Sequence, residues 1–164
     1  MADRFKNILK KIKKVINGVD LDPTAHDAAD RIRRRTRLSG GVKDSKRGGN
    51  RTKLDGLSPR YKKQRAKDKK NGILDKTTTA KRSNLTRTGQ MLRSLTGRVR
   101  GKTIIVSLEG DRDDGKSNAE VANYHRTGEG RVARDFFELT DKEIKGLRNQ
   151  VKKDLIKSLR KNKI

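Results

Sequence analysis

Apolar residues recur every three or four positions near both ends of the chain, and this spacing predicts two amphipathic helices. The N-terminal stripe consists of Phe5, Ile8, Leu9, Ile12, Val15 and Ile16. The C-terminal stripe consists of Ile144, Leu147, Val151, Leu155 and Leu159. Gly18 ends the first helix, and Thr140 with Glu143 forms a capping box that starts the last one.

The remaining positions of the N-terminal helix are mostly basic: Lys6, Lys10, Lys11, Lys13 and Lys14. Two interpretations are open. The helix either covers the core, or it binds a membrane surface or a partner protein. We favour the first, because a small core needs all six apolar residues of the stripe.

A second helix is predicted to open at Asp22-Pro23-Thr24, because proline suits the first turn of a helix. Its stripe consists of small residues that predict close packing against another helix: Ala25, Ala28, Ala29 and Ile32. Its last turns carry a basic cluster: Arg33, Arg34, Arg35 and Arg37. This cluster either binds phosphate or simply suits the negative end of the helix dipole.

Residues 39–56 lose all periodicity and gather glycines among lysines and arginines, which predicts a flexible basic loop. Ser58-Pro59 then starts a short helix that runs to Lys70. This helix is almost wholly cationic: Lys62, Lys63, Arg65, Lys67, Lys69 and Lys70. It is either a solvated surface or a contact for DNA or an acidic neighbour.

The period changes to two at Leu95, where apolar and polar residues begin to alternate on both sides of Gly101-Lys102. This pattern predicts a β-hairpin up to Leu108. A short helix or turn over 88–95 precedes it, with Met91 and Leu92 facing inward. The expected fold is a single α+β domain over 1–164: N-terminal amphipathic helices, a small antiparallel sheet built around the hairpin, and a long C-terminal helix packed across the hairpin.

Composition makes the core small and the surface cationic. Of 164 residues 29% are hydrophobic and 40% are charged, and the net charge is +25. We expect part of the stability to come from association with partners. Such a surface favours contact with nucleic acid, anionic membrane or acidic protein. Cysteine is absent, which excludes disulfides and thiolate metal sites. No apolar run is long enough to span a membrane, and we expect synthesis in the cytoplasm.

One segment, 109–120, is locally acidic. Its aspartates suggest a calcium loop, but Gly110 and Arg112 stand where two ligands belong. We therefore favour an exposed loop, which could pair with a basic face of a neighbouring copy.

The sequence offers no catalytic constellation, so we expect neither an enzyme nor a bound cofactor. It has two histidines, His26 and His125, and no Ser-His-Asp grouping, phosphate-binding glycine loop or His-rich metal spacing. His125 with Glu120 or Glu129 would form an acid–base pair without a nucleophile or a metal. No small-molecule substrate is therefore expected.

Three signatures follow one another between Leu85 and Leu139. They are Leu85-Thr86-Arg87-Thr88-Gly89-Gln90-Met91-Leu92-Arg93-Ser94-Leu95, Ala122-Asn123-Tyr124-His125-Arg126-Thr127-Gly128 and Arg131-Val132-Ala133-Arg134-Asp135-Phe136-Phe137-Glu138-Leu139. Their order resembles the tail-completion, or virion morphogenesis, proteins that join head to tail in tailed bacteriophages. Leu57-Ser58-Pro59 also resembles a step of that family.

This resemblance implies a structural virion protein at the head–tail junction, assembled in the host cytoplasm. It implies a homo-oligomeric, hexameric ring that caps the tail, contacts tail-tube and head-connector proteins, and lets genomic DNA pass. The motif residues expected to hold the fold or contact other subunits are Gly89, Leu92, Leu95, Tyr124, His125, Gly128, Arg134, Phe136 and Phe137. The alternative is a free basic protein that binds DNA or RNA, supported by the basic helices.

Overall fold

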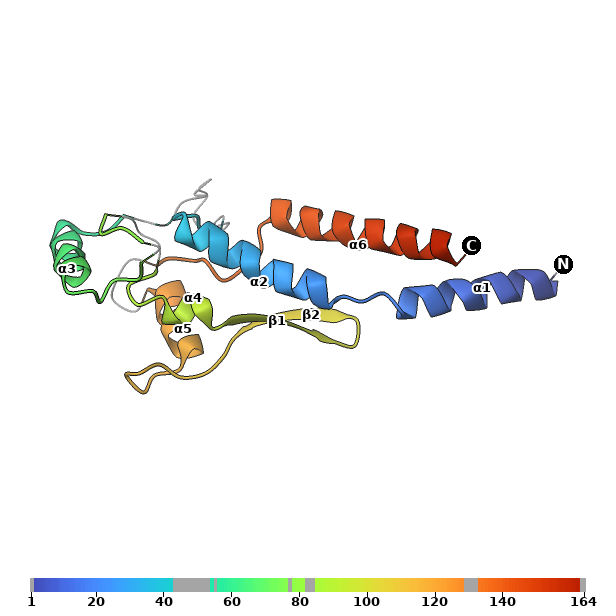
Figure 1. Ribbon diagram of the computed structural model, residues 1–164, viewed down its shortest axis with the longest axis horizontal. Coiled ribbons are helices and arrows are strands. Elements are labelled where there is room, and N and C mark those ends of the chain that lie inside the picture. Colours follow the sequence, from blue (N-terminus) through green and yellow to red (C-terminus); the bar gives the residue numbers. More distant parts are fainter. Residues whose placement is uncertain are drawn as a thin grey trace.

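The computed structural model describes residues 2–42, 54, 56–76, 78–81, 85–128 and 133–162, with side chains from residue 9 onward. The elements are α1 (Ala2–Asn17), α2 (Asp22–Arg37), α3 (Pro59–Lys70), α4 (Gln90–Arg93), β1 (Leu95–Arg100), β2 (Thr103–Leu108), α5 (Asn118–Thr127) and α6 (Asp141–Lys161). They form an elongated α+β molecule, with α3 at one end and α1 at the other (Figure 1). The predicted fold class is confirmed.

The helix starts follow from local side-chain chemistry. The Ser58 hydroxyl accepts a hydrogen bond from the Tyr61 amide at 3.2 Å at the start of α3. In α6 the Glu143 carboxylate accepts from the Thr140 amide at 2.8 Å, and the Thr140 hydroxyl accepts from the Glu143 amide at 3.3 Å. Both helix starts were predicted, because they depend on residues three positions apart.

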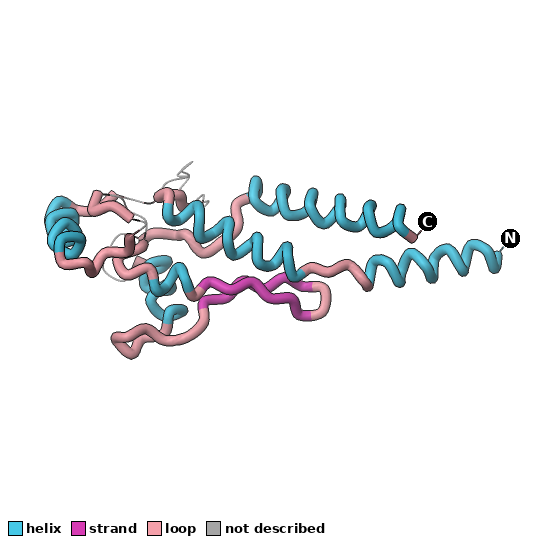
Figure 2. The backbone as a smooth tube through the Cα atoms, viewed as in Figure 1, coloured by secondary structure: helices cyan, strands magenta, loops and turns pink. Residues whose placement is uncertain are grey.

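The hairpin is antiparallel, with Leu95 opposite Leu108 and Arg100 opposite Thr103. Gly101 takes a φ of +62° in the two-residue turn, a conformation that favours glycine. The strands of this two-stranded sheet lie side by side (Figure 2). Such a sheet is marginal in water, so it needs a covering element.

Helix α2 is that element. Both β1 and β2 contact α2, and Ala25 and Ala28 are fully buried. A Cβ placed on Gly97 would lie 1.8 Å from the Ala25 carbonyl oxygen, so the strand backbone rests almost directly on the helix backbone. The small-residue stripe was predicted to pack against a helix. This was wrong, because β1 occupies the face that those small residues leave open.

Helix α6 packs on α2 and α1, on the side of α2 that faces away from the hairpin (Figure 1). The prediction that α6 crosses the hairpin was therefore wrong. Because α2 already covers the hairpin, the apolar stripe of α6 packs against α2 and α1 instead. Of that stripe only Leu147 is fully buried, so α6 keeps part of its apolar area at the surface.

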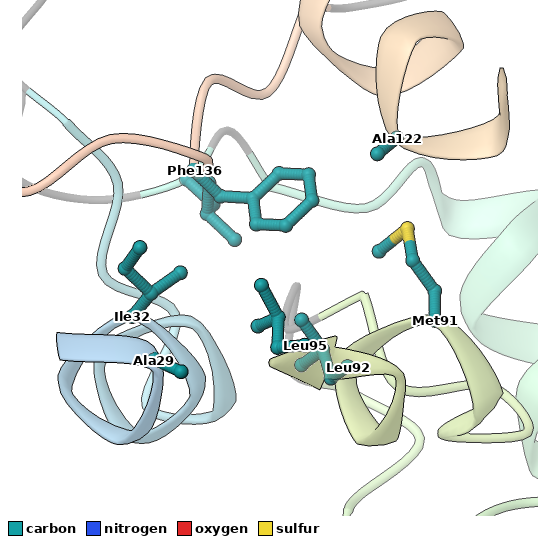
Figure 3. Close-up of a cluster of buried hydrophobic side chains, with 8 residues drawn as sticks. Ala29, Ile32, Met91, Leu92, Leu95, Ala122 and Phe136 are labelled. Atoms are coloured by element: carbon teal, nitrogen blue, oxygen red, sulfur yellow. The ribbon is translucent and has the colours of Figure 1, made fainter. Parts of the chain in front are cut away.

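The core forms where the three sequence signatures meet. Its buried members are Ala29, Ile32, Leu54, Met91, Leu92, Leu95, Ala122 and Phe136. Figure 3 labels seven of these side chains, and the six from α2, α4, α5 and the start of β1 lie around the Phe136 ring. Residues that lie up to about a hundred positions apart in sequence thus share one small apolar cluster.

Most of the basic loop expected over 39–56 lies outside the described residues. Its described ends are held in place. The Leu54 amide donates to the Ser39 carbonyl at 2.8 Å, and the Val42 amide donates to the Asp135 carbonyl at 3.0 Å. Leu54 belongs to the core, so the described chain just before α3 is anchored to the body.

Helix α1 was predicted, but its apolar face is only partly covered. Val15 is buried, whereas Leu9 is 41% and Ile16 is 43% exposed. Because α6 is the element that α1 contacts, the helix extends from the body rather than completing the core (Figure 1).

Candidate functional site

Helix α3 is held to the body through two charged side chains instead of an apolar stripe. Arg65 is 2% and Asp68 is 1% exposed, and they are the two buried residues of the helix. Tyr61 and Ala66, the apolar side chains of the helix, both lie at the surface. The helix therefore depends on polar contacts for its position.

These polar contacts form an ionic seat, which consists of Arg65, Asp68, Arg87 and Thr78. Arg87 donates to the Asp68 carboxylate from Nε at 2.8 Å and from Nη2 at 3.4 Å. Arg65 Nη2 donates to the Thr78 hydroxyl and to the Thr79 carbonyl, each at 3.1 Å. The Asp68 carbonyl also accepts from the Ile73 amide at 2.9 Å, so the end of α3 is fixed as well.

Charge in the seat is stabilised by these partners. The hydrogen bond from Arg87 holds the pKa of Asp68 below its ordinary value, although burial opposes this. The same bond raises the pKa of Arg87. Burial lowers the pKa of Arg65, and electrostatic interactions with Tyr61 and Asp68 counteract part of that effect. The Asp68 carboxylate thus compensates the positive charges of Arg65 and Arg87 next to α3.

All the lysines of α3 are exposed, as expected for a surface that could meet an anion: Lys62, Lys63, Lys67, Lys69 and Lys70. Arg65 was grouped with them, and this was wrong, because its guanidinium is buried and binds Thr78 and Thr79. Arg60, which sequence reasoning did not select, is exposed at the start of the same helix. Its position in the first turn of the predicted helix was the sequence signal that could have identified it as a cation of this surface.

Two arginines of the basic cluster of α2 make contacts inside the chain. Arg33 donates to the carbonyls of Leu92 and Leu95 at 2.9 and 2.7 Å and pairs with Asp30. These bonds tie α2 to the hairpin. Arg33 was expected at a phosphate contact, but its guanidinium serves as an internal clamp.

Arg35 acts in the same way on the other side of α2. It donates to the Phe136 carbonyl at 2.7 Å and pairs with Glu143 in the capping box of α6. Burial lowers its pKa, and the nearby Glu143 charge opposes this. Arg35, also a candidate contact for phosphate or an acidic partner, thus makes its described contacts inside the chain. In the rest of the cluster Arg34 is exposed and Arg37 is half-buried.

The motif residues of the first and third signatures mostly build the fold. Leu92 and Phe136 are fully buried, and the Phe136 and Phe137 ring centroids are 6.1 Å apart. Gly89 at the start of α4 has φ +76°, and Gly128 at the end of α5 has φ +84°. Glycine is required at both ends because a side chain would strain that conformation.

The second signature forms helix α5, which sequence analysis missed. The Tyr124 hydroxyl binds the Glu120 carboxylate, and Lys116 lies 5.2 Å from the Tyr124 ring centroid. The His125 carbonyl accepts from the Arg134 amide at 2.7 Å. Arg134 Nη2 also donates to the Gly56 carbonyl at 3.3 Å. Glu129, considered as a partner of His125, lies outside the described residues.

The acidic segment 109–120 is stabilised by contacts among its own residues and by one contact from α4. Asp111 forms an isolated bridge with Ser117, Arg112 pairs with Asp114 at 3.1 Å, and Gln90 binds Asp113. Within the part of the chain that the structure describes, no group of three or more acidic, histidine or cysteine side chains could hold a metal ion.

No protein-family model matches the chain, and no similar curated protein and no similar solved structure was found. Among the described residues no helix has the length and apolar character needed to cross a membrane.

Proposed function

We propose that this chain is a structural subunit of the head–tail junction of a tailed phage, belonging to the tail-completion group that it resembles. It would assemble with copies of itself into a hexameric ring, cap the tail and dock it to the head connector. Its work would be binding and positioning, without a chemical reaction.

One observation carries the proposal: the three separate signatures meet in a single core. Leu92 and Leu95 come from the first, Ala122 from the second and Phe136 from the third. A pattern whose members pack together is one that a shared fold would preserve. This gives the ordered motifs a physical reason to occur together, which a chance match would lack.

The thin core supports a role in an assembly. Large apolar side chains that remain exposed include Leu9 and Ile16 on α1, Ile105 on β2 and Ile156 on α6. Covering such area on association adds free energy that the single chain lacks. The cationic surface would meet acidic neighbours or the phosphates of DNA in the channel.

A second candidate function, free nucleic-acid binding, is favoured by the exposed cationic surface of α3. The two functions separate in a purification experiment from a lysate of the phage that encodes the chain. Particles are collected and washed with increasing salt, and the chain is quantified by mass spectrometry. A junction subunit stays with tails at high salt, because apolar contacts and shape hold it there. A free nucleic-acid binder is released by salt, since counterions compete for phosphate. Recovery only as soluble monomer would contradict the proposed function.

A further inference from the structure

Four exposed cations of α3 lie in one row. With 3.6 residues per turn, Arg60, Lys63, Lys67 and Lys70 fall within a sector of about 80°. All four are exposed, whereas Arg65 and Asp68 lie on the side of the helix that is buried. We call this row the α3 stripe. It points away from the ionic seat, so the seat holds the stripe outward.

The α3 stripe contains no compensating acid. Asp68, the one acidic residue of the helix, is buried and bound to Arg87. Neighbouring cations three and four positions apart repel each other, which destabilises the helix. A stretch that opposes its own folding in this way indicates an external anion that removes the repulsion.

We propose that the α3 stripe binds the phosphate backbone of nucleic acid without reading its sequence. At 1.5 Å per residue the stripe is about 15 Å long, which matches about four base pairs of duplex. Lysine suits phosphate as a point charge. Contacts from such cations to phosphate fix position without carrying sequence information, so binding follows charge and spacing.

Nucleic acid fits this surface better than an acidic protein does. Protein interfaces bury an apolar centre within a polar rim. Gln64 and Ala66 flank the stripe on its two sides, and Tyr61 lies beside the seat. A surface made of evenly spaced charge alone is typical of polyanion binding.

The inference deepens the proposed function, on which it rests for the identity of the nucleic acid as the phage genome. Binding itself is measured without particles, with the purified full-length chain. The probe is a fluorescent duplex of random sequence, and its dissociation constant is followed by anisotropy over a range of salt concentrations. The decisive quantity is the slope of log affinity against log salt, which counts the phosphates neutralised.

The test variant is Arg60→Gln, Lys63→Gln, Lys67→Gln and Lys70→Gln together. Its matched control also removes one arginine and three lysines, all exposed: Arg100→Gln, Lys102→Gln, Lys145→Gln and Lys153→Gln. We expect the stripe variant to lower the magnitude of the slope by about 3 to 4 and to weaken binding at least roughly tenfold at low salt. The control should change the slope by about one or less.

A charge-retaining variant guards against loss of structure. Lys63→Arg, Lys67→Arg and Lys70→Arg together should keep the slope of the wild type, and circular dichroism should show the same helix content for every variant. Equal slopes for the stripe and control variants would overturn the inference, because net charge alone would then explain binding. Unchanged duplex binding with loss of binding to polyglutamate would also overturn it and would assign the stripe to an acidic protein.

The two proposals fail separately. If the stripe binds duplex but particles contain none of the chain, the proposed function falls and the inference stands. If the chain is in the particles and the stripe variant binds duplex as the wild type does, the inference falls and the proposed function stands.

Discussion

At the scale of single residues, charged side chains replace apolar ones as structural contacts. Arg33 and Arg35 bind main-chain carbonyls on opposite sides of α2, and Arg65 and Asp68 seat α3. Because 29% of the residues are hydrophobic, few apolar side chains are available to make such contacts. A buried arginine whose charge is compensated by a nearby anion tolerates its desolvation, whereas one left without its anion does not.

Replacing Asp68 tests this dependence. We expect Asp68→Asn to lower the free energy of unfolding by about 2 kcal/mol at neutral pH, because Arg87 loses an ionic partner and the seat loses its anion. The Asp68 pKa is lowered in the folded protein, so its contribution is complete above the ordinary value of 3.8 and disappears as the pH falls through the lowered pKa. The difference between wild type and Asp68→Asn should therefore be constant near neutral pH and shrink in strong acid. Urea unfolding over a pH series measures it.

A double-mutant cycle provides the control. Because Asp68 and Arg87 share one interaction, Arg87→Gln should cost much less in the Asp68→Asn background than in the wild type. Fully additive costs, or a difference between wild type and Asp68→Asn that does not change with pH, would show that the ion pair does not hold α3.

At the scale of elements, the molecule is organised around α2, which contacts the hairpin on one side and α6 on the other. Gly97 makes the first of these contacts possible, since its missing side chain lets β1 approach Ala25. The approach is between two backbones, so neither side can yield by changing a rotamer.

The substitution Gly97→Ala tests that contact. Its Cβ would be placed 1.8 Å from the Ala25 carbonyl oxygen, so the hairpin must move away from α2. We expect a loss of about 3 kcal/mol or more in the free energy of unfolding, measured by urea denaturation. Gly56→Ala is the matched control, because no atom lies within 4 Å of the added Cβ, and it should leave stability nearly unchanged. A stable Gly97→Ala protein would contradict the described packing.

Elements set by neighbouring residues could be predicted from the sequence. The Ser58 cap, the Thr140 and Glu143 capping box, the alternation in the hairpin and the inward direction of Leu92 depend only on local spacing. Helix α5 was not predicted, because its residues form only a weak amphipathic pattern and their motif does not by itself indicate a helix. The positions of α6 and Arg65 depend on which surfaces other elements already cover, and this does not appear in a local pattern.

The candidate site was predictable in composition but not in geometry. The sequence shows that α3 is cationic, but not that Asp68 and Arg87 fix which side is outward. The same limit applies to the basic cluster of α2, where half the candidate arginines bind carbonyls. One clue was available: Asp68 is a lone acid in a helix with seven basic residues. A lone acid among so many cations suggests an internal partner.

At the scale of the whole molecule, the chain is elongated and strongly basic, with its core near one end and α1 extending at the other (Figure 1). A net charge of +25 makes copies repel one another at low ionic strength. Stable association therefore needs apolar contact or an anionic partner between the copies. In the proposed assembly the half-covered faces of α1 and α6 would supply the first, and DNA would supply the second.

The most direct measurement is electron microscopy of phage particles produced without this chain, followed by the same preparation with the chain restored from a plasmid. The account predicts that filled heads and complete tails accumulate unjoined in its absence, and that joined particles return on restoration. Normally joined, infectious particles formed without it would contradict the account.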